Sequence, residues 1–133
     1  MEQIQLTITG DPAPQGSKRI IHGRLVEASS GKLKKWRKAI EIACREYQNQ
    51  NILLGPLEVQ VHFYLPRPAS VKQSKRFYPI VPPDLDKLCR GLLDGIGQSE
   101  VIWGDDSQVV KLIAYKSYAD DTESGAVVTI SEL

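Results

Sequence analysis

Two aspartates stand one residue apart in the segment VPPDLDKLCRGLLDGI, residues 81–96. Asp84 and Asp86 follow a double proline and precede a pattern typical of an amphipathic helix. If the segment is extended, both side chains lie on the same side, since residues in a strand alternate between faces. Two ionised carboxylates held close together raise each other's pKa unless a cation or a protonated partner lies between them. The pair therefore predicts a cation site, with a helix cap at Asp86 as the structural alternative.

A second acidic pair, Asp105 and Asp106, lies in the segment WGDDSQ. Gly and Asp are common turn residues for backbone reasons, so this pair also has a structural explanation. We expect the helix between the two pairs to be only about ten residues long, so that the strand after it returns beside the first pair. Three or four converging carboxylates suit Mg²⁺ or Mn²⁺ rather than zinc. Such an ion lowers the pKa of a bound water and holds the oxygens of a phosphodiester.

The net charge of +1 conceals a strong segregation of charge along the chain. Residues 17–38 contain eight lysines and arginines against one acid, residues 67–76 add four with no acid, and the chain from Leu93 onward is acidic. This pattern is compatible with a nucleic-acid partner, although a helix studded with cations is often only solvated. Phe77 and Tyr78 beside the second basic stretch either stack on open bases or cover the core. The candidate contacts to DNA phosphates are Lys18, Arg19, Lys32, Lys34, Lys35, Lys38, Lys75, Arg76 and Lys87.

The spacing of apolar residues predicts an α/β (α+β) fold: a single domain with a mixed sheet of about four main strands and two helices, in the order β-α-β-α-β-β. The expected elements are a strand at 2–9, a hairpin or irregular strand around His22 and Gly23, a helix at 31–48, a strand at 57–65, a long loop at 66–83, a second helix that ends near 95–98, and strands at 108–118 and 126–133. Ser29 or Ser30 is the expected N-cap of the first helix. The expected buried stripe of the second helix comprises Leu88, Leu92, Leu93 and Ile96.

Length and composition limit the class of protein. A chain of 133 residues has the size of one ordinary domain, and 41% hydrophobic with 25% charged residues is typical of a soluble globular protein. No apolar run approaches the roughly 20 residues of a membrane span, and MEQIQLTITG lacks the pattern of a signal peptide, so we expect a cytoplasmic protein. Cys44 and Cys89 are expected to be reduced and buried, because two thiols make neither a disulfide framework nor a zinc site. We assign His22 and His62 no role and expect no organic cofactor.

The blocks PDLDKLCRGLLDGI and WGDDSQVVKL, in this order and spacing, resemble the signature of the RusA family of Holliday junction resolvases. The segment PAPQGSKR resembles the basic loop that follows the first strand in that family, and the expected closing hairpin is similar too. The two acidic blocks are a fairly specific signal, whereas the N-terminal loop alone is a weak one. Because the resemblance covers nearly the whole chain, residues 1–133 are expected to form a single RusA-like endonuclease domain.

The resemblance implies a homodimeric, Mg²⁺-dependent endonuclease, with Mn²⁺ as a possible substitute, that nicks two opposed strands of a four-way DNA junction symmetrically during DNA recombination and repair. It implies that Asp84, Asp86 and Asp106 are the essential metal-binding acids, with Asp105 as a lesser contributor. The family's catalytic lysine falls on Arg90, which keeps the charge but presents a planar fork that does not easily release a proton. Because members of the family are often encoded by phages or prophages, we expect that origin here.

Another departure from the family is Lys87, where Asn is usual; the extra cation either weakens metal binding or helps DNA binding. The structural alternative for Arg90 is an exposed ion pair with Asp86 or Asp94 on the same helix face. The main functional alternative is a non-catalytic junction- or DNA-binding protein whose acids serve as turns and caps. A phosphatase needs an apolar strand before DLD and a Thr-like residue after it, a glycosyltransferase needs a longer chain, and a calcium loop needs a later acid and glycine that are missing.

Overall fold

Alternating apolar residues build the central sheet. The computed structural model describes residues 3–15, 18–27 and 30–133. The strands of the sheet are β1 (Gln3–Thr9), β4 (Leu57–Leu65), β5 (Val109–Tyr118) and β6 (Gly125–Glu132). In β1 and β4 every second side chain is buried, because successive residues of a strand point to opposite faces. The strand order is β1-β6-β4-β5, so β1 and β5 form the two edges.

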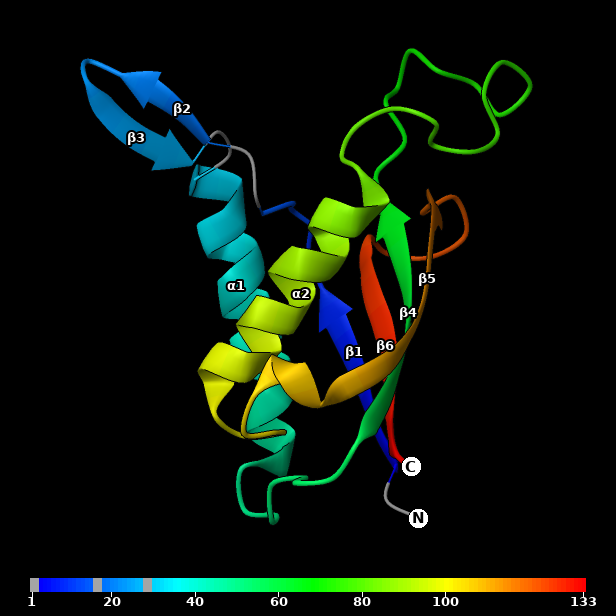
Figure 1. The fold of residues 1–133 in the computed structure, drawn as a ribbon. Helices are drawn as coiled ribbons and strands as arrows, with labels where there is room; N and C mark the ends of the chain where they lie inside the picture. The colour runs from blue at the N-terminus through cyan, green and yellow to red at the C-terminus, as the bar shows by residue number, and fades with distance from the viewer. Residues whose placement is uncertain (1–2, 16–17, 28–29) are drawn as a thin grey trace.

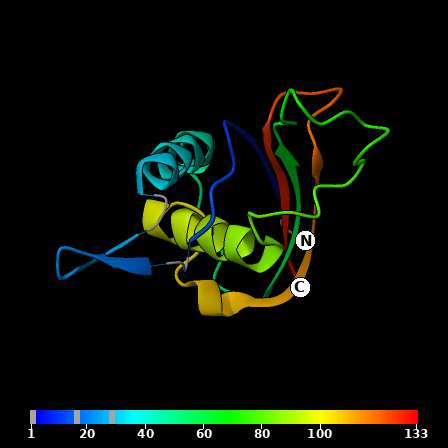
Figure 2. The same cartoon turned by 90° about the horizontal axis from the view of Figure 1, so that it is seen from above.

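The direction of β5 determines the place of the second helix. β6 runs antiparallel to β1 and β4, whereas β5 runs parallel to β4. Parallel neighbours need a long crossover connection, which here includes α2 (Leu85–Ser99). α2 and α1 (Ser30–Cys44) cover the same face of the sheet, and a 3₁₀ turn, η1 (Arg45–Tyr47), continues α1 (Figures 1 and 2). Among residues 3–15, 18–27 and 30–133, no helix combines the length and the apolar character that a membrane span requires.

The two helices approach each other closely at Gly95. A Cβ atom at this position would lie 2.8 Å from Cδ1 of Ile40 and 3.2 Å from Cδ of Arg37, so a larger residue would displace these side chains or move the helices apart. Cys44 and Cys89 are free and buried beside this contact layer, as predicted. The buried side chains that α1 and α2 contribute to the core include Leu33, Trp36, Ile40, Leu88, Leu92 and Ile96.

Most of the predicted architecture is confirmed. The fold class, the mixed four-stranded sheet, the two helices and their order along the chain agree with the sequence pattern. The expected closing hairpin is wrong, because β6 pairs with β1 and β4, and β4 lies between β6 and β5. The segment around His22 forms a two-stranded hairpin, β2 (Lys18–Ile21) and β3 (Arg24–Glu27), which is separate from the main sheet. The helix predicted at 31–48 begins at Ser30 and ends at Cys44, before the 3₁₀ turn. The N-cap proposed at Ser29 lies outside the described residues.

The predicted length of the second helix is wrong. α2 has 15 residues rather than about ten, because the helix continues through Gly95 and Gly97 and ends only where Glu100 adopts a left-handed conformation (φ 59°, ψ 21°). Leu93 is only partly buried, so it flanks the buried stripe and is not part of it. The longer helix places its two ends farther apart than the sequence suggested.

β5 is an edge strand with exposed apolar side chains. The four large ones are Val110, Leu112, Ile113 and Tyr115. In the described part of the chain, β5 pairs only with β4, so the backbone groups on its outer edge have no strand partner. A long edge of this kind is a template for pairing with a further strand, and monomeric proteins usually protect such edges.

Candidate active site

The first acidic pair lies at the N-terminus of α2. Asp84 is the N-cap residue, with an extended backbone (φ −69°, ψ 140°), and Asp86 lies in the first helical turn. The predicted capping alternative for Asp86 is wrong, because Asp84 occupies the cap position and its side chain makes no capping hydrogen bond. The carboxylate of Asp84 lies 3.3 Å from Nζ of Lys87, one of the predicted DNA contacts. Both acids are exposed and remain accessible to a ligand.

α2 carries an exposed polar stripe that starts at this pair. Asp86, Arg90 and Asp94 follow one another at four-residue steps and therefore share one face of the helix. Arg90 is exposed, and within the described part of the chain it forms no ion pair with Asp86, Asp94 or any other acid. The structural alternative for Arg90 is therefore not observed, and its guanidinium is available to an anionic ligand.

The second acidic pair flanks the start of a 3₁₀ turn, η2 (Asp106–Gln108), just before β5. Asp105 caps this turn: its carboxylate accepts hydrogen bonds from the backbone N–H (3.2 Å) and the hydroxyl of Ser107. These hydrogen bonds lower the pKa of Asp105. Gln108 completes a capping box, because Oε1 of its side chain accepts a hydrogen bond of 2.9 Å from the backbone N–H of Asp105. The carboxylate of Asp105 therefore has a structural role.

Asp106, in contrast, lies against Asp94 of α2. Burial raises the pKa of Asp106 above its ordinary value, and the charges of Asp105 and Asp94 and a hydrogen bond with Asp94 raise it further. A proton or a cation between these two carboxyl groups removes their repulsion. Asp94 also lies 3.9 Å from Nη2 of Arg37. The sequence singled out Asp94 only as an ion-pair partner of Arg90, and its position against Asp106 was not predicted.

Several of these carboxylates line a surface depression that we call the acidic pocket. Its lining residues are Asp94, Gly97, Gln98, Glu100, Gly104, Asp105 and Asp106. Asp84 and Asp86 do not line it, because they lie at the opposite end of α2 (Figure 1). Asp86 and Asp94 are eight positions apart, which corresponds to about 12 Å along the helix axis. Ligands of one Mg²⁺ lie about 2.1 Å from the ion, so the first pair and the acidic pocket are too far apart to share it.

The available donor atoms match a hard divalent cation in type. All the candidates are carboxylate oxygens, which Mg²⁺ prefers over nitrogen or sulfur. Within residues 3–15, 18–27 and 30–133, however, no three His, Cys, Asp or Glu side chains are arranged to hold one ion. Asp84, Asp86 and Asp106 of one chain therefore do not meet around a single ion in this structure.

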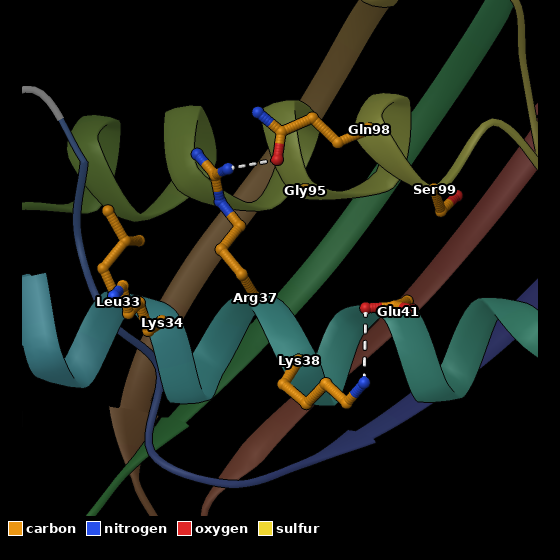
Figure 3. A pocket seen from close by; sticks show the side chains of 8 residues that line it. All are labelled: Leu33, Lys34, Arg37, Lys38, Glu41, Gly95, Gln98 and Ser99. Carbon is orange, nitrogen blue, oxygen red and sulfur yellow. Dashed lines mark hydrogen bonds and ion pairs between the residues drawn. The ribbon is translucent and has the colours of Figure 1, made fainter.

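Arg37 of α1 contacts the polar side chains of α2. Its Nη1 donates a hydrogen bond of 2.6 Å to Oε1 of Gln98 across the pocket between α1 and α2 (Figure 3). The predicted phosphate contacts on α1, all exposed, are Lys32, Lys34, Lys35 and Lys38. Nζ of Lys38 lies 3.8 Å from a carboxylate oxygen of Glu41. The contact of these lysines with DNA stays a prediction.

The other predicted DNA contacts differ in their surroundings. Lys18 and Arg19 belong to β2, but their side chains lie outside the described part of the structure. Lys75 is exposed on the loop between β4 and α2. Nε of Arg76 donates a hydrogen bond of 2.8 Å to the hydroxyl of Tyr118, so Arg76 is partly engaged within the protein.

Two comparisons with known proteins found matches that cover most of the chain. The family model described as "Endodeoxyribonuclease RusA" matches residues 9–131. The chain is also similar to "Uncharacterized protein YqaN" of Bacillus subtilis (strain 168), with 30% identity over 132 residues. The match covers 91% of this chain and 92% of that protein. The region matched by the family model contains the two acidic pairs, α2, β4, β5 and all of β6 but its last residue, and only the last residue of β1.

Proposed function

The chain belongs to the RusA endodeoxyribonuclease family, and from this membership we propose that residues 1–133 form one nuclease domain that resolves four-way DNA junctions by paired, symmetric nicks. The proposed setting is recombination and repair of DNA in the cytoplasm. The observation that carries the proposal is the polar stripe of α2, which has carboxylates at both ends and Arg90 between them. Among the described residues, the guanidinium of Arg90 forms no ion pair.

In this proposal, Asp84, Asp86 and Asp106 would hold a divalent ion, which is Mg²⁺ or, as a substitute, Mn²⁺. When bound, the ion lowers the pKa of a water and neutralises charge on the phosphate. Arg90 then stabilises the charge that develops on the phosphate oxygens, without giving up a proton. Asp105 acts through Asp106, because Ser107 already engages its carboxylate and the cap fixes the backbone that carries Asp106.

A second copy of the chain can supply the missing part of the site, and we propose a homodimer that pairs through β5. Asp106 directly precedes one end of this strand. Near its other end, Nζ of Lys116 donates hydrogen bonds to the backbone oxygens of Val81 (2.9 Å) and Pro83 (2.8 Å), just before Asp84. If two β5 edges pair antiparallel, the Asp106 end of each copy meets the Asp84 end of the other.

The surface of β5 supports this pairing. Val110 is 65% exposed and Tyr115 is 49% exposed, large values for apolar or aromatic side chains in a strand. Pairing of two such edges would satisfy backbone hydrogen-bonding groups and cover apolar surface in one step. Two equivalent sites related by a two-fold axis also suit a substrate that is cut at two symmetric positions.

Basic segments lie on both sides of the first acidic pair. Seen from above, the β2–β3 hairpin projects on one side of α2 and the loop at residues 66–83 on the other (Figure 2). The hairpin carries Lys18 and Arg19, and the loop carries Lys75. A DNA strand that crosses between the two projections would pass over Asp84, and we propose that these cations contact its phosphates. Such contacts make affinity fall steeply with salt concentration.

Incubation of the pure protein with a synthetic mobile four-way junction and Mg²⁺, followed by mapping of the cuts, tests the proposed activity. We expect paired nicks at symmetric positions and no cuts in chelator or in linear duplex. Asp86→Asn and Asp106→Asn should lose cleavage but bind the junction as tightly as before or more tightly, because phosphate repulsion falls. The matched control Asp121→Asn alters an exposed acid before β6 and should cleave normally. Unchanged cleavage by Asp86→Asn would contradict the metal-site proposal.

A non-catalytic junction-binding protein is the second candidate. The separation of the two acidic pairs within one chain favours it, because a single chain assembles no three-carboxylate group among its described residues. In that case the junction would bind but would stay intact at every concentration of Mg²⁺ or Mn²⁺. The same cleavage assay, with binding measured in parallel, separates the two candidates.

A further inference from the structure

The loop between β4 and α2, which we call the aromatic loop (residues 66–83), presents apolar side chains to solvent. Phe77 is 58% exposed, Tyr78 is 64% exposed and Ile80 is 81% exposed. The rings of Phe77 and Tyr78 pack edge to face, with centroids 5.0 Å apart. The possibility that this pair covers the core is therefore wrong. The loop projects beyond the end of the sheet, next to the N-terminus of α2 (Figure 1).

Arg67 fastens the aromatic loop to the body of the protein. Nε and Nη2 of Arg67 donate to the two carboxylate oxygens of Asp120, at 2.8 and 3.0 Å. Nη1 donates to the backbone oxygen of Arg76 (2.5 Å), and Nη2 donates to that of Phe77 (3.2 Å). The guanidinium carbon also lies 4.1 Å from the ring centroid of Tyr118. Arg67 thus fixes the loop backbone at Phe77, the residue that carries the first aromatic ring.

The other side of the aromatic pair is fixed as well. Nζ of Lys116 donates to the backbone oxygens of Val81 and Pro83, which follow the pair. Nε of Arg76, which precedes the pair, donates to the hydroxyl of Tyr118. An aromatic pair held at both ends loses little further conformational entropy on binding, so a ligand gains most of the contact energy. Exposed apolar side chains that a protein holds in place typically mark a binding surface.

The charge of the loop indicates the chemistry of the ligand. Residues 66–83 contain four cations and no acid. Asp120 compensates the charge of Arg67, and the remaining three cations favour a ligand with negative charge. Flat apolar rings next to cations suit a nucleic acid whose bases are open to stacking. A regular duplex hides the faces of its bases, whereas the branch point of a four-way junction exposes them. Asp84 directly follows the loop, so bases on Phe77 and Tyr78 would lie beside the candidate metal site.

We propose that Phe77 and Tyr78 stack on the exposed base faces at the branch point and give the protein a preference for branched over linear DNA. This proposal rests on the proposed junction substrate. Arg67 and Asp120 are positioning residues in it, because they hold the loop and do not touch the DNA. The surface would take one or two unstacked bases of any sequence, since every base has a flat face.

Binding of a four-way junction and of a linear duplex of equal length, measured in chelator, tests the proposal. The double variant Phe77→Ala/Tyr78→Ala should lose roughly five- to fiftyfold in junction affinity, with little change for the duplex. Tyr78→Phe, which keeps a ring, should bind like the wild type. The control Leu54→Ala removes another highly exposed apolar side chain (76%) on the connection before β4 and should change neither affinity.

A fluorescent base analogue at the branch point gives a readout that folding alone would not change. Wild-type protein should alter its fluorescence through stacking, and the double variant should not. Asp120→Ala, which releases Arg67 but keeps both rings, should reduce the fluorescence change and the junction preference. Equal losses for junction and duplex, or no loss, would overturn the proposal. So would a double variant that changes from dimer to monomer, because the loop would then be a contact between copies.

These measurements need neither metal nor cleavage. A protein that binds junctions through the aromatic loop but never cuts them would support this inference and contradict the proposed nuclease activity. If the double variant without the aromatic pair still cuts junctions and binds them with unchanged affinity, the result would support the nuclease activity and contradict the stacking inference.

Discussion

Replacing Asp106 by Asn should stabilise the metal-free protein and at the same time abolish cleavage. Asp106 lies against Asp94 and next to Asp105, and its pKa is raised by burial and by these two charges. Two like charges about 4 Å apart repel by about 1 kcal/mol in water-like surroundings, which apply because Asp94 and Asp106 both keep contact with solvent. We therefore expect a gain of about 1 kcal/mol at pH 7, or a rise in Tm of roughly 3–5 °C for a domain of this size.

The gain should depend on pH in one direction. Because folding raises the pKa of Asp106 above its ordinary value of 3.8, the folded state binds this proton more tightly than the unfolded state does. The stability that protonation of Asp106 provides is fully present below the unfolded pKa and is lost as the pH rises through the folded pKa. The advantage of Asp106→Asn over the wild type should therefore be small near pH 4 and complete at pH 7.

Urea unfolding in chelator at a series of pH values measures this difference. Asp105→Asn serves as the control with the opposite sign, since hydrogen bonds from Ser107 lower the pKa of Asp105. The ionised carboxylate of Asp105 stabilises the folded state above the ordinary pKa of this group. This contribution is lost as the pH falls through the lowered pKa of the folded state. At pH 7, Asp105→Asn should therefore be less stable than the wild type. A destabilised Asp106→Asn at pH 7, or a gain that does not vary with pH, would refute the electrostatic explanation.

Three further predictions concern the dimer, the helix contact and the DNA surface. Ile113→Lys places a charge on the exposed strand β5 and should convert the dimer to a monomer in sedimentation; an unchanged dimer would argue against pairing at this edge. Gly95→Val should cost about 1–3 kcal/mol in urea unfolding, because the new side chain meets Ile40, and a neutral result would mean that the helices separate easily. Lys34→Ala should lower the slope of log Kd against log salt by about one, whereas Arg45→Ala in η1 should leave it unchanged; equal slopes would remove the start of α1 from the DNA surface.

The sequence predicted which faces are buried better than it predicted which strands are neighbours. The alternation in β1 and β4 identified their buried residues, because the period of a strand is independent of its partners. β5 is apolar enough for a central position, yet it lies at the edge. Its place follows from the crossover through α2, which periodicity does not encode. The exposed residues on β5, such as Val110 and Tyr115, became visible only with the sheet order.

The sequence indicated which residues are candidates for the site, but it did not indicate how these residues are arranged. The sequence pattern singled out Asp105 and Asp106 together, but only backbone geometry shows that Asp105 is the cap and that Asp106 faces α2. The position of Asp94 against Asp106 was not predicted, because it depends on the return of the chain beside α2. The sequence pattern underestimates the length of α2 because glycine is a common signal of a helix end, whereas here Gly95 lies inside the helix and lets α2 pack closely against Ile40.

The claim that Asp86 of one chain and Asp106 of another form one site is tested most directly by mixing two inactive variants. In a dimer of Asp86→Asn with Asp106→Asn, one shared site would carry both substitutions and the other would carry none. With equal amounts and free exchange, about half of the dimers are mixed, so about one quarter of all sites are intact. We predict that the mixture nicks junctions at about one quarter of the wild-type rate, although neither variant cuts alone. A mixture that stays inactive after verified subunit exchange would contradict the shared site.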